Sequence, residues 1–348
     1  MGHHVTVTHP YEHLKPERVH GKCYFKRFSK MLYANQSQNN INVGLVPFSI
    51  LTTVTTCVFL YINGIMLFTL RSKPVFRETP SYILLYNLLL ADTIHLAESQ
   101  VMYMLAGCGI RLTYSVCGVL VMLATLTNDI SPLILVVMSL ERYVAVCYPL
   151  KHSTIITIRT TELAVIVVWI FSSLNILTRV LLLLNVSFAF NQMTDFCGKE
   201  NMLLNPLSDV YDKVFTYLVF LSAGVTVTFS YIAVVVAARS VSANKALARK
   251  ARNTLLLHVV QLGLSLSSTI HNPLLIAISK VLDRIVIVRI QIVFYVFIII
   301  FPRCLSALIY GIRDQTIRPV LMYSLCCQWR RSALLSVVPA KGKVRTLH

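Results

Sequence analysis

The sequence predicts an all-α membrane protein, a bundle of seven transmembrane helices with a short amphipathic helix after the seventh span. Of the 348 residues, 56% are hydrophobic and only 13% are charged, whereas a soluble domain carries about 25% charged residues. Seven segments are predominantly apolar over about 20 residues or more, enough to cross about 30 Å of hydrocarbon. We expect helices because each span must satisfy its own backbone polar groups inside the bilayer.

The predicted spans divide the chain into three parts. An amino-terminal segment covers residues 1–44, the transmembrane domain covers 45–312, and an amphipathic helix with a tail covers 313–348. The connections between spans are short and no internal repeat is evident, so we expect one domain. The predicted spans are residues 45–70, 81–107, 113–147, 161–184, 210–238, 253–279 and 288–312.

The basic residues predict the orientation of the chain. Lys and Arg gather in the loops after the first, third and fifth spans and in the tail, so these segments are expected to face the cytoplasm and the amino terminus to be extracellular. We interpret most of the net charge of +18 as this orientation signal and as attraction for anionic lipids. The expected location is the plasma membrane, with membrane lipids as partners and no nucleic acid.

Residues 1–30 contradict this orientation, because they carry six basic residues on the expected outer side: Lys15, Arg18, Lys22, Lys26, Arg27 and Lys30. We expect Met31 to be the better start, with residues 1–30 an upstream extension. The alternative is a genuine but disordered extension, since long tails escape the charge rule. In either case Asn35-Gln36-Ser37 is a glycosylation acceptor pattern on a short outer segment.

A motif at the end of the third span carries the strongest functional signal. Glu141, Arg142 and Tyr143 place an acid, a base and a phenol there, and the run continues through Pro149 to His152. With this motif, the chain resembles rhodopsin-like (class A) G-protein-coupled receptors, and most of all fish odorant receptors. The resemblance extends over essentially all seven spans. A chance run of interfacial Arg and Tyr is the alternative, but the spacing, the position and the basic flank all favour the motif.

The resemblance implies roles for several residues. Arg142 would act as a switch. In the resting state Glu141 would neutralise its charge, and an open crevice at the inner end would free its side chain to bind a heterotrimeric G protein. Coupling would also use Tyr143, Tyr231, Tyr310 and the basic loop 239–252. The resemblance further implies a disulfide between Cys117 and Cys197, and the tail suggests palmitoylation of Cys326 and Cys327.

An intramembrane polar core is expected around Asp92 of the second span, because a buried ionisable group should be paired. Many relatives hold a sodium ion there, and Asn63, Ser131 and Ser306 match the polar positions. Arg303 lies one helical turn before Ser306, and we predict that it pairs with Asp92 in place of sodium. The alternative is an Arg303 that faces a water-filled crevice without touching Asp92.

The helix hinges depart from the family pattern. In the seventh span Ala307 replaces the proline of Asn-Pro-x-x-Tyr, and the nearest proline is Pro302, which we expect to supply a bend. The sixth span lacks the Trp-x-Pro hinge and has Gly263, with Pro273 further out.

A ligand site is expected in the outer half of the bundle. Polar side chains inside a membrane span are costly, so those found there indicate a functional role. Each candidate could instead make a structural hydrogen bond between helices. Position 124, where amine receptors place an aspartate, is Ala124, which disfavours a biogenic amine. The candidates are His95, Glu98, Ser99, Thr125, Asn128 and Asp129.

These features predict an odorant-receptor-like protein that binds a small-molecule odorant and activates a heterotrimeric G protein. No phosphate loop, zinc spacing or nucleophile elbow suggests an enzyme, a metal or a cofactor. The alternative within the class is a non-olfactory receptor for a peptide or lipid. A transporter or channel is less consistent with the absence of repeated halves, and a retinal protein would need a lysine inside the seventh span, whereas Lys280 precedes it.

Overall fold

The fold was analysed in a computed structural model of the chain. The structure describes residues 39–108, 110–184, 197–198, 206–240 and 293–304, and singly residues 253, 256, 259, 260, 263, 278, 286, 290, 307, 311, 317–319 and 322. Nearly all of them are helical. The predictions for residues 1–30 and for Asn35, Ser306, Tyr310, Cys326 and Cys327 lie outside this part of the chain.

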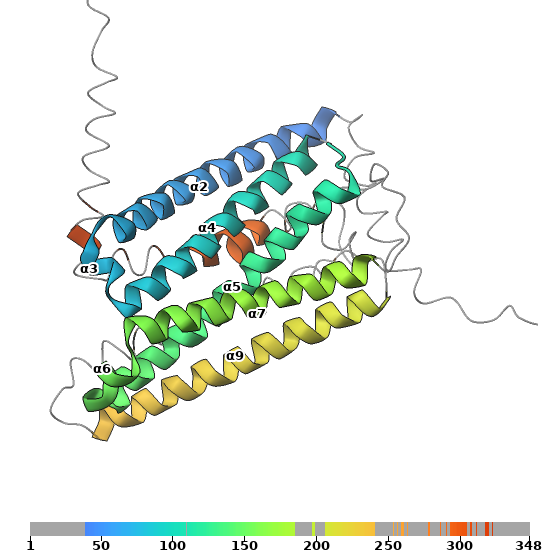
Figure 1. The fold of residues 1–348 in the computed structure, drawn as a ribbon. Helices are drawn as coiled ribbons and strands as arrows, with labels where there is room; N and C mark the ends of the chain where they lie inside the picture. The colour runs from blue at the N-terminus through green and yellow to red at the C-terminus, as the bar shows by residue number, and fades with distance from the viewer. Residues whose placement is uncertain are drawn as a thin grey trace, which may run out of the picture.

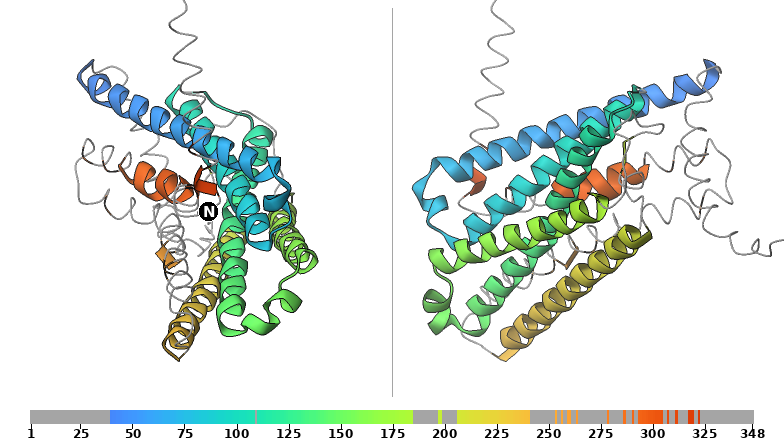
Figure 2. Two further views of the ribbon diagram at one scale, coloured as in Figure 1. Left: turned by 90° about the vertical axis from the view of Figure 1, so that its left-hand side faces the viewer. Right: turned by 45° about the vertical axis from the view of Figure 1, so that its right-hand side comes forward.

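Five long helices lie side by side in the described part of the bundle (Figures 1 and 2). They coincide with the first five predicted spans. The central helix is α5, which contacts α4, α7 and α9. The helices are α2 (Asn39–Ser72), α4 (Pro80–Gly107), α5 (Tyr114–Cys147), α7 (Ile158–Leu184) and α9 (Pro206–Ser240).

Short helices connect the long ones at one end of the bundle, called here the Arg142 end (Figure 1). They are α3 (Pro74–Arg77) between α2 and α4, and η1 (Pro149–Lys151) and α6 (His152–Ile155) between α5 and α7. Proline stands in the first turn of α3, α4 and η1, where a missing N–H costs nothing and the fixed φ favours the helix. The opposite end is called the Cys117 end.

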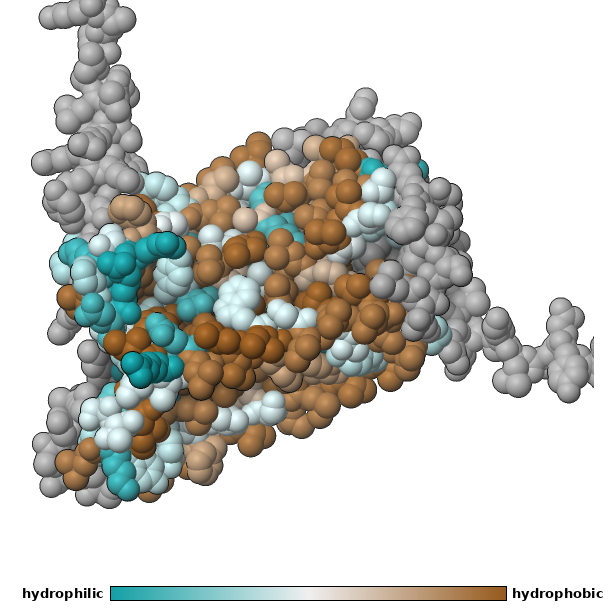
Figure 3. Space-filling view, viewed as in Figure 1, coloured by the Kyte–Doolittle hydropathy of each residue, from teal (hydrophilic) through white to brown (hydrophobic). Residues whose placement is uncertain are grey.

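The surface of the helices supports the predicted location in a membrane. Four of the described helices are long and apolar enough to cross one: α2 from Ile50, α5, α7 and α9. Large apolar side chains such as Leu163, Leu221 and Val225 are exposed on them, and in Figure 3 hydrophobic residues line the helices while hydrophilic ones gather at the Arg142 end. So much exposed apolar surface would be a liability in water but suits lipid.

The main core lies where α2, α4, α5 and α7 meet. Met66, Leu88, Ile134 and Leu135 are completely buried in it. The indole N–H of Trp169 on α7 also donates to the side-chain oxygen of Asn87 on α4 at 3.2 Å. This packing fixes the positions of the polar residues that α4, α5 and α7 carry into the bundle.

The last described helical segment contains a wider, π-helical turn, η3 (Tyr295–Ile300). The N–H of Phe301 donates to the carbonyl of Val296, five residues earlier, and Pro302, which has no N–H to donate, follows directly. The bend that the sequence suggested at Pro302 thus coincides with a π turn in the preceding residues. Ile300 and Cys304 pack against Leu96 of α4, which brings Arg303 beside α4.

Candidate functional site

At the Arg142 end, four side chains form a cluster that we call the Arg142 cluster: Ser81, Glu141, Arg142 and His152. The Nε of Arg142 lies 3.2 Å from Oε2 of Glu141, so the predicted neutralising pair is present. The hydroxyl of Ser81, at the start of α4, donates to Oε1 of Glu141 at 2.9 Å and accepts from Nη2 of Arg142 at 3.5 Å. The Arg142 side chain keeps 30% of its surface exposed, against 7% for Glu141, so it is held but accessible.

The aromatic residues of this end connect α5 to α9. The ring of Tyr143 lies 5.9 Å from that of Tyr148 and 6.2 Å from that of Phe229 on α9. Tyr231 packs with Val146 and Cys147 around the buried Val234. The predicted coupling residues Tyr143 and Tyr231 therefore lie on the two helices whose ends meet beside Arg142.

Deeper in the bundle, a second group surrounds Asp92, and we call it the Asp92 cluster: Asp92, Asn128, Ser131 and Arg303. Nη1 of Arg303 donates to Oδ1 of Asp92 at 2.9 Å, which confirms the predicted pair. Ser131 donates to the same oxygen at 2.7 Å, and Nη2 of Arg303 donates to Oδ1 of Asn128 at 2.5 Å. The arginine and aspartate side chains are 4% and 1% exposed, so this is a buried ion pair.

The backbone around the Asp92 cluster is interrupted by prolines. Pro132 lies inside α5 directly after Ser131 and removes the N–H that would bond the carbonyl of Asn128. Pro302 directly precedes Arg303. Asn63 of α2 is fully buried, but within the described residues neither of its amide atoms has a hydrogen-bond partner, so it does not bond to this cluster.

A third group of polar residues joins α5, α7 and α9, and the sequence did not predict that they meet. We call it the Arg179 cluster: Asp129, Asn175, Arg179, Tyr211 and Asp212. Asp129 accepts from Nδ2 of Asn175 at 2.7 Å. Oδ1 of Asn175 accepts from Nε of Arg179 at 3.3 Å and from the hydroxyl of Tyr211 at 3.0 Å. Arg179 also pairs with Asp212 of α9, and its guanidinium lies 5.7 Å from the centre of the Tyr211 ring. The rarity of ionisable residues in spans was the signal that could have singled out Arg179.

Two predicted ligand residues, His95 and Glu98, lie one turn apart on α4, and His95 contacts α5. Nδ1 of His95 lies 3.2 Å from both the carbonyl oxygen of Ala124 and the hydroxyl of Thr127. Glu98 is buried, with 6% of its surface exposed. The hydroxyl of Thr125 donates to the Val121 carbonyl of its own helix at 2.8 Å.

The six candidate ligand residues therefore do not form one group. His95 and Glu98 lie at the α4–α5 contact with Thr125 nearby along α5, and Ser99 is half-buried on α4. The structure places Asn128 in the Asp92 cluster and Asp129 in the Arg179 cluster.

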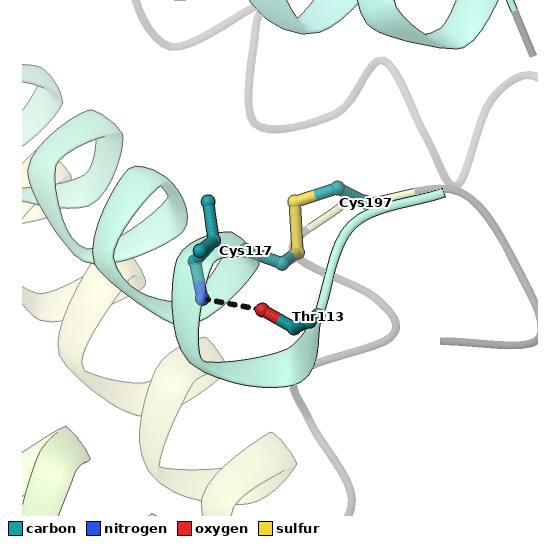
Figure 4. The surroundings of a disulfide bond; sticks show 4 residues. Thr113, Cys117 and Cys197 are labelled. Atoms are coloured by element: carbon teal, nitrogen blue, oxygen red, sulfur yellow. Dashed lines mark hydrogen bonds between the residues drawn. A yellow bond between two sulfur atoms is a disulfide. The ribbon is translucent and has the colours of Figure 1, made fainter. Parts of the chain in front are cut away.

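At the Cys117 end, the implied disulfide is present between Cys117 and Cys197, with a Cα–Cα distance of 5.5 Å (Figure 4). The N–H of Cys117 donates to the carbonyl of Thr113 at 3.0 Å in the first turn of α5. Cys108, another cysteine near this end, is free and exposed. The bond holds the segment at residues 197–198 against the start of α5.

The comparisons with known proteins agree with this architecture. The sequence profile of the seven-transmembrane receptors of the rhodopsin family matches residues 62–334. The chain is 30% identical to Odorant receptor 131-2 of Danio rerio, over 84% of this chain and 91% of that protein. It is 28% identical to Olfactory receptor-like protein OLF4 of Canis lupus familiaris over 52% of this chain and 62% of that protein, and 30% identical to Olfactory receptor 1G1 of Gorilla gorilla gorilla over 43% and 48%.

The chain belongs to the rhodopsin family of seven-transmembrane receptors. It is a receptor of the G-protein-coupled class with relatives among odorant and olfactory receptors, and not an enzyme.

Proposed function

We propose that this receptor detects a small-molecule odorant at the Cys117 end and activates a heterotrimeric G protein at the Arg142 end. The observation that carries the proposal is the Arg142 cluster. A permanent cation is held at the membrane edge by one buried carboxylate, yet 30% of its side chain remains exposed. Such a pair is weak enough to be exchanged for contacts with a protein partner.

The proposal includes the topology of the chain. Residues 1–44 are extracellular, residues 45–312 form the complete bundle of seven spans, and residues 313–348 form a cytoplasmic amphipathic helix and tail. The basic loops at the Arg142 end support a cytoplasmic location for that end. The disulfide supports an oxidising, extracellular location for the Cys117 end. Glycosylation of Asn35 and palmitoylation of Cys326 and Cys327 follow from the same orientation.

The ligand site lies in the half of the bundle toward the Cys117 end, where His95 of α4 contacts Ala124 of α5 and Glu98 lies one turn further along α4. The relatives support a small ligand, since Odorant receptor 131-2 and Olfactory receptor-like protein OLF4 are among them. Ligand binding there would reach the Arg142 end through α5, which carries residues of all three polar clusters.

The test is nucleotide exchange on purified heterotrimeric G proteins, measured with membranes of cells that express the full chain and a screen of water-soluble odorants. Wild type should accelerate exchange with at least one odorant, and Arg142→Ala should abolish the acceleration at equal surface expression. Arg71→Ala, which removes an exposed arginine at the same end, is the matched control and should retain it. Acceleration that survives Arg142→Ala would refute the proposed coupling.

A further inference from the structure

Glu98 is the buried acid whose environment the proposed function leaves unexplained. Its residue exposure is 6%, and within the described part of the chain neither carboxyl oxygen has a hydrogen-bond partner. It lies one turn along α4 from His95, whose Nδ1 is 3.2 Å from the Ala124 carbonyl oxygen of α5. By contrast, the buried Asp92 accepts hydrogen bonds from Arg303 and Ser131, and Asp129 accepts one from Asn175.

A carboxyl group removed from water without a partner is costly to the folded protein. If this residue contributed to stability alone, an apolar residue of similar volume would serve as well or better, since such a replacement is often neutral or stabilising. Retaining an unpaired acid at this place is therefore better explained by a partner that arrives from outside the chain.

The side chains around Glu98 indicate what kind of partner would fit. One turn further along α4, Met102 packs against the Cys117 and Val121 side of α5, and Ala124 presents only a methyl group. The hydroxyl of Thr125 is already bonded within its helix. An inorganic cation needs several oxygen ligands, and among the described residues no group of three potential metal ligands is present. An apolar organic molecule with one cationic nitrogen matches one carboxylate in apolar surroundings.

We infer that this receptor binds organic ammonium ligands, with the Glu98 carboxylate as the group that receives the cationic nitrogen. Glu98 stands on α4 one turn from His95, which contacts Ala124 of α5, so α4 supplies an acid near position 124, which itself lacks one. This inference departs from the expectation drawn from Ala124, which concerned the aspartate position of α5 alone. This inference rests on the proposed function, since it names the ligand class of the same site, but its test does not depend on coupling.

The test measures ligand binding as the thermal stabilisation of the purified full-length receptor. The probes are two pairs that share a carbon skeleton, 2-phenylethylamine with 2-phenylethanol and n-hexylamine with n-hexanol. The amines should raise Tm in a dose-dependent manner, whereas the alcohols should not. In Glu98→Gln the apparent Kd for the amines should rise by about 10- to 100-fold, because a charge-assisted contact becomes a neutral one. Glu162→Gln, at an exposed position near the Arg142 end, should leave the Kd unchanged.

A second readout separates ligand recognition from a structural role. Without ligand, Glu98→Gln should unfold at the same temperature as wild type or higher, since it removes an unpaired acid. Loss of amine binding in a variant of undiminished stability would support the inference. Equal stabilisation of wild type and Glu98→Gln by the amines, or no stabilisation of wild type at millimolar amine, would overturn it. The proposed function would be refuted separately, by G-protein activation that persists in Arg142→Ala.

Discussion

Asn128 and Asp129 are adjacent in α5, yet their side chains belong to the clusters of two different buried arginines. Asn128 accepts a hydrogen bond from Arg303, while Asp129 accepts from Asn175, which in turn accepts from Arg179. Successive residues of an α-helix point about 100° apart, so one turn of α5 serves two polar clusters on two sides. A displacement of α5 at this level would disturb both clusters at once.

The first prediction concerns the cation in the Asp92 cluster. Because the guanidinium of Arg303 bonds to Asp92 and Asn128, replacing Na⁺ by choline should leave Tm and signalling of wild type unchanged. Arg303→Met leaves a buried carboxylate uncompensated and should lose about 3–5 kcal/mol of stability in choline. Part of the lost stability should be regained in Na⁺, because the ion could then bind beside Asp92 in the place of the guanidinium.

The control for this prediction is Asp92→Asn combined with Arg303→Met, which removes both charges and should show no sodium effect. Thermal unfolding of the purified receptor in matched Na⁺ and choline buffers checks all three proteins. A sodium effect in wild type that disappears in Asp92→Asn would contradict the assignment of Arg303 as the resident cation.

The second prediction concerns release of Arg142. Glu141→Gln removes the charge that lies 3.2 Å from Nε of Arg142, and because Arg142 is partly exposed the pair is worth only about 0.5–1 kcal/mol. Ligand-free G-protein activation should rise by about two- to fivefold. Ser81→Ala should raise it in the same direction by less, since Ser81 holds both residues through hydrogen bonds. The measurement is basal nucleotide exchange at equal surface expression. A lower basal exchange rate in either variant would contradict the idea that Glu141 and Ser81 restrain Arg142 in the resting state.

The third prediction concerns the Arg179 cluster. Arg179→Met leaves Asp212 buried without its guanidinium and should cost about 3–5 kcal/mol of stability. The chain provides a matched control one turn away on α9, where Lys213 and Asp209 form an exposed pair at 2.9 Å with side chains 61% and 43% exposed. Lys213→Met should change stability by less than about 0.5 kcal/mol. Similar losses from both substitutions, measured as thermal or denaturant unfolding, would show that burial does not distinguish the two pairs.

The fourth prediction concerns the disulfide. The bond joins residues 80 apart, and loop-entropy reasoning gives it a stabilising contribution of about 4 kcal/mol. Cys117→Ser, Cys197→Ser and the double variant should therefore be destabilised to a similar extent, whereas Cys108→Ser should match wild type. Mass spectrometry of alkylated, non-reduced protein should find Cys117 and Cys197 linked. Alkylation of either cysteine, or a stability loss in Cys108→Ser, would argue against this pairing.

The sequence predicted the helices more completely than the polar contacts. Long apolar runs define spans by themselves because each span bonds its own backbone, so the first five predicted spans coincide with helices. The Asp92–Arg303 pair was also predictable, since two opposite charges inside a membrane domain have few other ways to be neutralised. The Arg179 cluster was missed because it joins three helices, with Asp129, Arg179 and Asp212 far apart in sequence, and because its residues match no motif.

By itself, the sequence determined the membrane class, the family resemblance and the presence of the Glu141–Arg142 motif, because these depend on composition and on residues close together along one helix. Only the tertiary structure decided which polar residues meet. It assigned Asn128 to Arg303 and Asp129 to Asn175, and it placed Ser81 on the Glu141–Arg142 pair. It also left both carboxyl oxygens of the buried Glu98 without a hydrogen bond among the described residues. The physical reason is that the rotation of each helix about its axis is set by packing against its neighbours, and a rotation of one residue moves a side chain to a different partner.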